Sequence, residues 1–164
     1  MSRQTTDALA TYLARYDRLV EVGIGRRTDV ASALVDRGVD VTATDIYPRA
    51  VPPGVRFVRD DIVARSREDP GPLYAVDAVY ALNLPPELHR PACDVAHAAG
   101  ADFCFTTLGG DPPSVPVERV TLDGETLFVS RHRDRNERGD SRGSNGPRGP
   151  RESDGSDDPG ESMR

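Results

Sequence analysis

The fold of this chain is decided by residues 19–28, which read Leu-Val-Glu-Val-Gly-Ile-Gly-Arg-Arg-Thr. Four residues typical of a short buried strand run into a Gly-x-Gly turn, and Thr28 is typical of a helix start. The glycines at 23 and 25 let the backbone turn tightly and let a ligand approach it closely. The stretch therefore predicts a strand, a turn and a helix N-terminus whose free N–H groups can face a ligand.

The sequence separation between this turn and a later acidic residue is typical of a nucleotide-binding site. Asp45 lies 20 residues past Gly25, at the end of a second predicted strand over residues 40–46. A carboxylate in that place can accept hydrogen bonds from both hydroxyls of a ribose. The strict dinucleotide fingerprint has a third Gly where this chain has Thr28. We interpret the pattern as an adenosine-type ligand site; the alternative is that the glycines only form the turn.

Strands and helices alternate on both sides of this stretch. Helices are predicted over residues 7–18, with Thr6 as N-cap, between Thr28 and Gly38, and over residues 86–99. Strands are predicted over residues 19–22, 40–46, 54–60, 77–83 and 102–108, and residues 117–122 and 125–131 flank an Asp-Gly hairpin turn. This order predicts an α/β fold, a Rossmann-like doubly wound mostly parallel sheet with a C-terminal antiparallel hairpin. Ligands in such sheets bind at the carboxyl ends of the strands.

Composition narrows the classes of function. The chain has 164 residues, and all 21 of its Lys+Arg residues are Arg, which excludes Schiff-base chemistry and a Walker phosphate loop. With 27 Asp+Glu residues the net charge is -6, which disfavours binding to nucleic acid or to an anionic membrane. No apolar stretch approaches the roughly 20 residues of a membrane span, and the N-terminus has no signal-peptide pattern. Two cysteines make no disulfide framework, so we expect a cytoplasmic protein with no membrane partner.

The composition changes near residue 132. Residues 133–164 are rich in Gly, Ser, Arg and Asp, and Met163 is their only large apolar residue. Such a segment cannot bury enough surface to offset its ordering entropy, so we predict a Rossmann-like domain over residues 1–132 and a disordered tail over residues 133–164. The Arg-Gly pairs of the tail are typical of nucleic-acid-binding segments, but no aromatic residue accompanies them. We favour a solubilising tail.

The first motif resembles that of the class I S-adenosylmethionine-dependent methyltransferases, an acid followed by Gly-x-Gly at the end of the first strand. Glu21, Gly23 and Gly25 match it, and Arg27 stands where the usual third Gly would fall. The resemblance implies that Asp45 holds the ribose hydroxyls and that Asp61, after the third strand, contacts the adenine amine.

The end of the fourth strand also resembles a methyltransferase element. Residues 83–88 read Asn-Leu-Pro-Pro-Glu-Leu, similar to the Asn-Pro-Pro-Tyr element of amino-methylating enzymes, although Leu84 is inserted and the aromatic residue is absent. Asn83 is therefore a candidate to orient an amine or hydroxyl substrate.

A closer resemblance covers residues 5–130. The patterns EVGIGR, TDI, DDI and VYALNLPPEL resemble a small archaeal family of uncharacterised proteins, uncharacterised protein family one-four-six. That resemblance implies a short Rossmann-like domain similar to methyltransferases. The use of Arg in place of Lys, with abundant Asp, resembles the proteins of salt-loving (halophilic) archaea.

Two further clusters have competing interpretations. His89, Cys93 and His97 are four residues apart and could ligate zinc from one helix face. Pro91 argues against one uninterrupted helix, so we expect it to lie in the first turn of the helix. We then expect the histidines to be exposed and the cysteines to lie in the core, with no metal site.

The arginine pair at the glycine turn also has two interpretations. Arg26 and Arg27 could bind an anion at the turn, or they could be a solvated pair, which is the alternative that we favour.

These observations favour a methyltransferase-like protein that binds S-adenosylmethionine or a related adenosine ligand. Two alternatives stay open: a non-catalytic Rossmann module that binds a nucleotide or a protein partner, and an NAD-type redox half-domain. An apolar pocket beside residues 83–86 that opens next to Asp61 would favour an enzyme, and a filled cleft would favour a module. The sequence specifies neither a substrate nor an oligomeric state.

Overall fold

The computed structural model describes residues 1–132 and contains seven strands, four α-helices and one 3-10 helix within them. The strands are β1 (Arg18–Val22), β2 (Asp40–Asp45), β3 (Arg56–Arg59), β4 (Ala78–Leu84), β5 (Asp102–Thr107), β6 (Glu118–Leu122) and β7 (Glu125–Ser130). The helices are α1 (Arg3–Leu13), α2 (Asp29–Asp36), α3 (Ile62–Arg65), η1 (Pro72–Tyr74) and α4 (Pro86–Ala98). The predicted tail, residues 133–164, lies outside the described residues.

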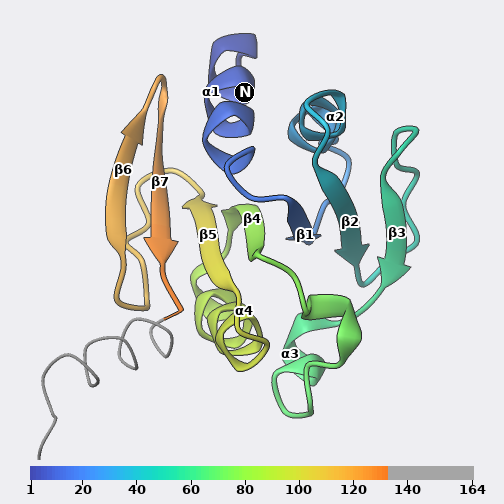
Figure 1. Cartoon of the computed structure of the whole chain (residues 1–164). Coiled ribbons are helices and arrows are strands. Elements are labelled where there is room, and N and C mark those ends of the chain that lie inside the picture. Colours follow the sequence, from blue (N-terminus) through green and yellow to red (C-terminus); the bar gives the residue numbers. More distant parts are fainter. Residues whose placement is uncertain (133–164) are drawn as a thin grey trace, which may run out of the picture. The chain divides into compact units, whose positions relative to one another are not determined.

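The strands form one sheet in the order β3-β2-β1-β4-β5-β7-β6 (Figure 1). Pairing is parallel from β3 through β5, and β7 runs antiparallel between β5 and β6. The strand order reverses at β1, where the chain leaves β3 and returns on the other side of β1 as β4. The predicted doubly wound, mostly parallel sheet with a C-terminal hairpin is therefore confirmed.

Helices cover both faces of this sheet because its central strands carry apolar side chains on alternate faces. On one face Leu19 and Val41 pack with residues of α1 and α2, such as Leu9 and Leu34. On the other face Val20 and similar side chains pack with residues of α3 and α4. Successive strand residues point to opposite faces, which leads to these two separate cores. Parallel strands also bring their carboxyl ends to one edge of the sheet, where polar residues are free to form a site.

The N-terminal helix begins and ends earlier than the sequence predicts. Ser2, not Thr6, is its N-cap, and its hydroxyl accepts a hydrogen bond from Thr5 N at 3.1 Å. Thr6 is buried within the helix. The prediction was wrong because Ser2 is an equally good capping residue one turn earlier. The helix ends at Leu13, since residues 14–17 must link it to β1.

The fourth helix corrects the expectation for His89. α4 runs through Pro91, and His89 is fully buried. The His89 ring lies 4.6 Å from that of Phe105, its Nε2 is 2.9 Å from Leu84 O, and its Nδ1 accepts from Ser114 N at 3.1 Å. The proline removes only one internal hydrogen bond, and this packing and pairing outweigh that loss.

Both cysteines, Cys93 and Cys104, are free and buried, which confirms their predicted place in the core. Within residues 1–132, no helix combines the length and the apolar character that crossing a membrane requires.

Candidate functional site

A pocket of about 250 Å³ opens at the carboxyl ends of β1, β2, β3 and β4. It lies beside β1, where the strand order reverses, as expected for a ligand site in this kind of sheet. Its polar wall is formed by Asp45, Arg49, Asp60 and Asn83, and its apolar wall by side chains that include Val22, Leu82, Leu84, Pro85 and Leu88. Apolar walls with a few convergent polar groups are typical of small-molecule sites.

The glycine turn after β1 is fastened to the end of β2. Gly23 and Gly25 take φ values of 69° and 58°, which a residue with a Cβ seldom adopts. Gly23 N and Ile24 N both donate to Thr44 O, at 2.9 and 3.0 Å. Gly25 N donates to the Asp45 Oδ2 atom at 2.8 Å. The turn therefore fixes the position of the Asp45 carboxylate.

Asp45 is nearly buried and is held from three sides. Besides the bond from Gly25, its Oδ1 accepts from Tyr47 N at 3.0 Å, and Arg49 Nε lies 3.4 Å from its Oδ2. An ionised carboxylate has about four acceptor positions, so these contacts leave capacity for hydroxyl donors from a ligand. Arg49 was not among the residues singled out in the sequence, because no motif specifies a cation four residues past the acid.

Glu21, the acid of the first motif, lies away from the pocket. Its side chain is 1% exposed, and its Oε1 accepts a hydrogen bond from Tyr80 Oη at 2.7 Å. Burial raises the pKa of Glu21 to about 8, although the bond from Tyr80 opposes the shift. Its neighbours Val20 and Val22 face the α3–α4 side, so alternation along β1 turns Glu21 toward the α1–α2 side.

Two adjacent acids follow β3, and the structure gives them different surroundings. Asp61 is exposed and is the N-cap of α3, accepting hydrogen bonds from Val63 N at 2.9 Å and Ala64 N at 3.4 Å. Asp60 lines the pocket. It accepts from Tyr74 Oη at 2.7 Å and forms an ion pair with Arg65 at 3.0 Å.

Burial, together with the hydrogen bond to Asp60 and the charge of that carboxylate, raises the pKa of Tyr74 above its ordinary value. Adjacent residues on an extended strand point to opposite faces, which is the signal in the sequence that only one of the two acids reaches the pocket.

Asn83 has the backbone conformation that most distinguishes this site. Its φ is 53°, and within residues 1–132 it is the only residue other than Gly with a positive φ. It lies where the pairing of β4 with β5 shifts register, and its N–H donates to Thr106 Oγ1 at 2.8 Å. Left-handed backbone costs energy in a residue with a Cβ, less so in Asn than in most others, and such conformations cluster at functional sites. The apolar pocket beside residues 83–86 thus exists, and it opens next to Asp60 rather than Asp61.

The other candidates from the sequence lie outside the pocket. Arg26 and Arg27 are both exposed, as the interpretation of a solvated pair expects, and neither side chain has a hydrogen-bond or ion-pair partner in residues 1–132. Cys93 lies 3.9 Å from the ring nitrogens of His97, while His89 pairs elsewhere. In the described part of the chain, no group of three or more His, Cys, Asp or Glu residues is placed to hold a metal ion.

Comparison with known proteins places this geometry in context. Residues 3–133 match the profile of Uncharacterised protein family (UPF0146). A UPF0146 protein of Halobacterium salinarum is 55% identical over 125 residues, which cover 75% of this chain and 94% of the relative. A UPF0146 protein of Archaeoglobus fulgidus is 40% identical over 126 residues, 75% of this chain and 92% of the relative.

Among solved structures, the chain is similar to an RNA methyltransferase from Salinibacter ruber in complex with S-adenosyl-L-homocysteine. The TM-score is 0.55 at 18% sequence identity, and the match covers 79% of this chain and 91% of that one. At this identity the similarity is one of fold, and it shows that the sheet is of the methyltransferase Rossmann-like type.

Proposed function

The chain belongs to the uncharacterised protein family UPF0146, and from the site at the carboxyl ends of its strands we propose that it binds S-adenosylmethionine or a related adenosine ligand. One observation carries the proposal. The Asp45 carboxylate is held by Gly25 N and Tyr47 N against the wall of a largely apolar pocket. A fixed carboxylate beside a glycine turn is suited to accept the two hydroxyls of a ribose.

The remaining residues fit roles around such a ligand. The Gly23-to-Gly25 turn would allow the ligand to approach the backbone closely. The adenine amine would be bound by the acid pair after β3, with Asp60 acting from the pocket wall. Asp61 would act there only after releasing its hydrogen bonds to the start of α3. Glu21 would support the turn from the opposite face of β1.

For methyl transfer at this site, we propose that Asn83 orients the group that is methylated. When bound, S-adenosylmethionine would supply an electrophilic methyl group. Its sulfonium sulfur would keep the electrons of the broken S–CH3 bond, and the substrate nitrogen or oxygen that gains the methyl group would release its proton to water. The Asn83 amide could accept a hydrogen bond from an amine or hydroxyl and direct its lone pair toward the methyl group. The strained backbone of Asn83 in the pocket wall favours a methyltransferase over a non-catalytic binding module.

The pocket is slightly smaller than the ~300 Å³ at which typical ligand sites begin. It therefore suits the adenosine part of the ligand, and a substrate would lie partly outside it. Exposed apolar side chains near the strand ends, Ile46 and Tyr47 after β2 and Leu108 after β5, offer surface for this purpose. NAD remains the alternative cofactor, since the ribose of its adenosine half would donate the same two hydrogen bonds to Asp45.

Calorimetric titration of the full chain in concentrated KCl tests the proposal. We expect micromolar binding of S-adenosylmethionine and of its demethylated product, with much weaker binding of NAD. Asp45→Asn should weaken binding at least about tenfold (~1.4 kcal/mol), because the amide retains only one acceptor oxygen. Asp36→Asn, an exposed acid at the end of α2, is the matched control and should bind normally.

Binding of NAD alone would replace the proposal with a redox or nucleotide-sensing role. Absence of binding to all three ligands would show that the glycine turn is only architectural.

A further inference from the structure

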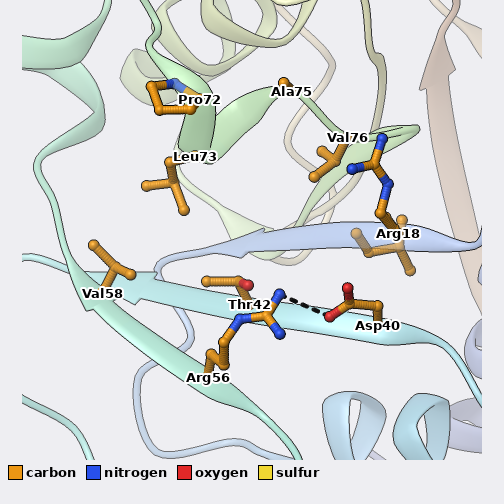
Figure 2. Close-up of a pocket in the computed structure, with 10 residues that line it drawn as sticks. Arg18, Asp40, Thr42, Arg56, Val58, Pro72, Leu73, Ala75 and Val76 are labelled. Carbon is orange, nitrogen blue, oxygen red and sulfur yellow. Dashed lines mark hydrogen bonds and ion pairs between the residues drawn. The ribbon is translucent and has the colours of Figure 1, made fainter.

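A second pocket, of about 340 Å³, lies at the opposite end of the strands from the adenosine site (Figure 2). Its floor is formed at the amino ends of β1, β2 and β3, by side chains that alternate onto one face of the sheet. Figure 2 shows the segment of residues 72–76 above this floor, with Leu73 pointing toward the strands. The volume falls within the range of small-molecule sites.

The pocket is open because the segment that connects β3 to β4 contains little helix to cover the sheet. Only α3, with four residues, and η1, with three, follow β3 before β4 begins. Tyr74 is fully buried and reaches Asp60, so it fills the carboxyl half of this face. Over the amino half lie the smaller side chains of Pro72, Leu73 and Val76, which leave the pocket between themselves and the strands.

Two polar side chains of the pocket lack partners within residues 1–132. Arg18 is exposed at the rim of the pocket, and its guanidinium has no hydrogen-bond or ion-pair partner within residues 1–132, so it is available to a ligand. The Thr42 side chain lines the pocket although Thr42 is only 6% exposed, and its hydroxyl has no partner in the same part of the chain. Most of Thr42 is packed into the sheet, and its unpaired hydroxyl opens onto the pocket, where it can donate a hydrogen bond to a ligand.

The remaining charges define what this ligand would be. Arg56 pairs with Asp40 at 2.8 Å across the floor (Figure 2), in an ion pair exposed to solvent. The two arginines and one aspartate leave one net positive charge, that of Arg18. The other lining side chains are mainly apolar, chiefly Val58, Leu73 and Val76.

We propose that this pocket binds a small organic monocarboxylate with a short apolar body. The carboxylate accepts paired hydrogen bonds from the planar guanidinium of Arg18 and a further one from the Thr42 hydroxyl. The hydrocarbon part lies against Val58 and Leu73 and is removed from water there. This site stands independently of the adenosine site, because the two pockets occupy opposite ends of the strands and share no lining residue.

Titration of the full chain with hexanoate, followed in methyl-resolved NMR spectra, tests this proposal. We expect saturable shifts of the Val58, Leu73 and Val76 methyl signals, with a Kd near or below about 1 mM. Hexan-1-ol has the same chain length and no charge, and it should bind at least about tenfold more weakly (~1.4 kcal/mol). Signals of Val22 and Leu88 in the adenosine pocket should not move.

Two variants assign the contacts. Arg18→Gln should weaken hexanoate binding by about tenfold and leave the hexan-1-ol affinity unchanged, and Thr42→Val should weaken hexanoate by about threefold. Arg90→Gln, an exposed arginine on α4, is the matched control.

The proposal is overturned if hexanoate gives no saturable shift up to roughly 10 mM. Equal affinities for hexanoate and hexan-1-ol would overturn it as well. The comparison of the two ligands uses the unmodified chain, so it decides the question even where a variant fails to fold.

Discussion

Glu21→Gln should change how the stability of this protein depends on pH. Glu21 is buried, its pKa is raised to about 8 by desolvation, and it pairs with Tyr80. In the unfolded chain the group regains its ordinary pKa of 4.5. Between these two values the folded state holds a proton that the unfolded state has lost. The free energy of unfolding therefore falls as the pH rises through this interval.

The size of the effect follows from the two pKa values. One proton contributes a slope of about 1.4 kcal/mol per pH unit, so the whole interval corresponds to at most about 5 kcal/mol. The contribution of Glu21 is most favourable below pH 4.5 and is lost as the pH passes about 8. Glutamine keeps an oxygen that accepts from Tyr80 and has no proton to lose. Its buried amide N–H groups add a cost that does not vary with pH.

Urea denaturation of both proteins from pH 5.5 to 7.5, at constant high salt, measures this difference. We expect the unfolding free energy of Glu21→Gln relative to the unmodified chain to rise by up to about 2.7 kcal/mol over this range. Tyr80→Phe is the informative second variant. Loss of its hydrogen bond raises the pKa of Glu21 further, so the decline in stability should continue to higher pH. Parallel curves for Glu21→Gln and the unmodified chain would refute the reasoning.

Three further predictions concern stability and are checked by chemical denaturation. Asn83→Ala should cost about 1–2 kcal/mol because φ is 53° there, whereas Asn83→Gly should cost little; equal losses would contradict the argument from backbone strain. Gly54→Ala should destabilise by about 1–3 kcal/mol, since a Cβ would lie 2.6 Å from Val35 Cγ1. Gly38→Ala has a similar φ but open space, so it should cost only about 1 kcal/mol, and the reverse order would refute the clash. His89→Phe should cost about 2–4 kcal/mol because two buried backbone groups lose their partner; a change below about 0.5 kcal/mol would show that they pair elsewhere.

The sequence by itself determined the order of the elements and the general location of the candidate site. Runs of β-branched residues, the glycine turn after β1 and the Asp-Gly turn between β6 and β7 are local signals. The structure contains the strands and turns that these signals predict, because each signal depends on the conformational preferences of a few adjacent residues. The 20-residue spacing from Gly25 to Asp45 also indicated that these residues lie together, and in the structure Gly25 N donates a hydrogen bond of 2.8 Å to the Asp45 carboxylate.

Only the tertiary structure decided which side chains face one another. The burial of His89 depends on Leu84 and Ser114, and the left-handed conformation of Asn83 accompanies a register shift against β5. The position of Asp60 in the pocket wall depends on Tyr74, which lies 14 residues further along the chain. The open pocket at the amino ends results from how little of the crossover after β3 covers the sheet. Such features arise from packing between distant segments, whose free energy depends on contacts that no local pattern in the sequence specifies.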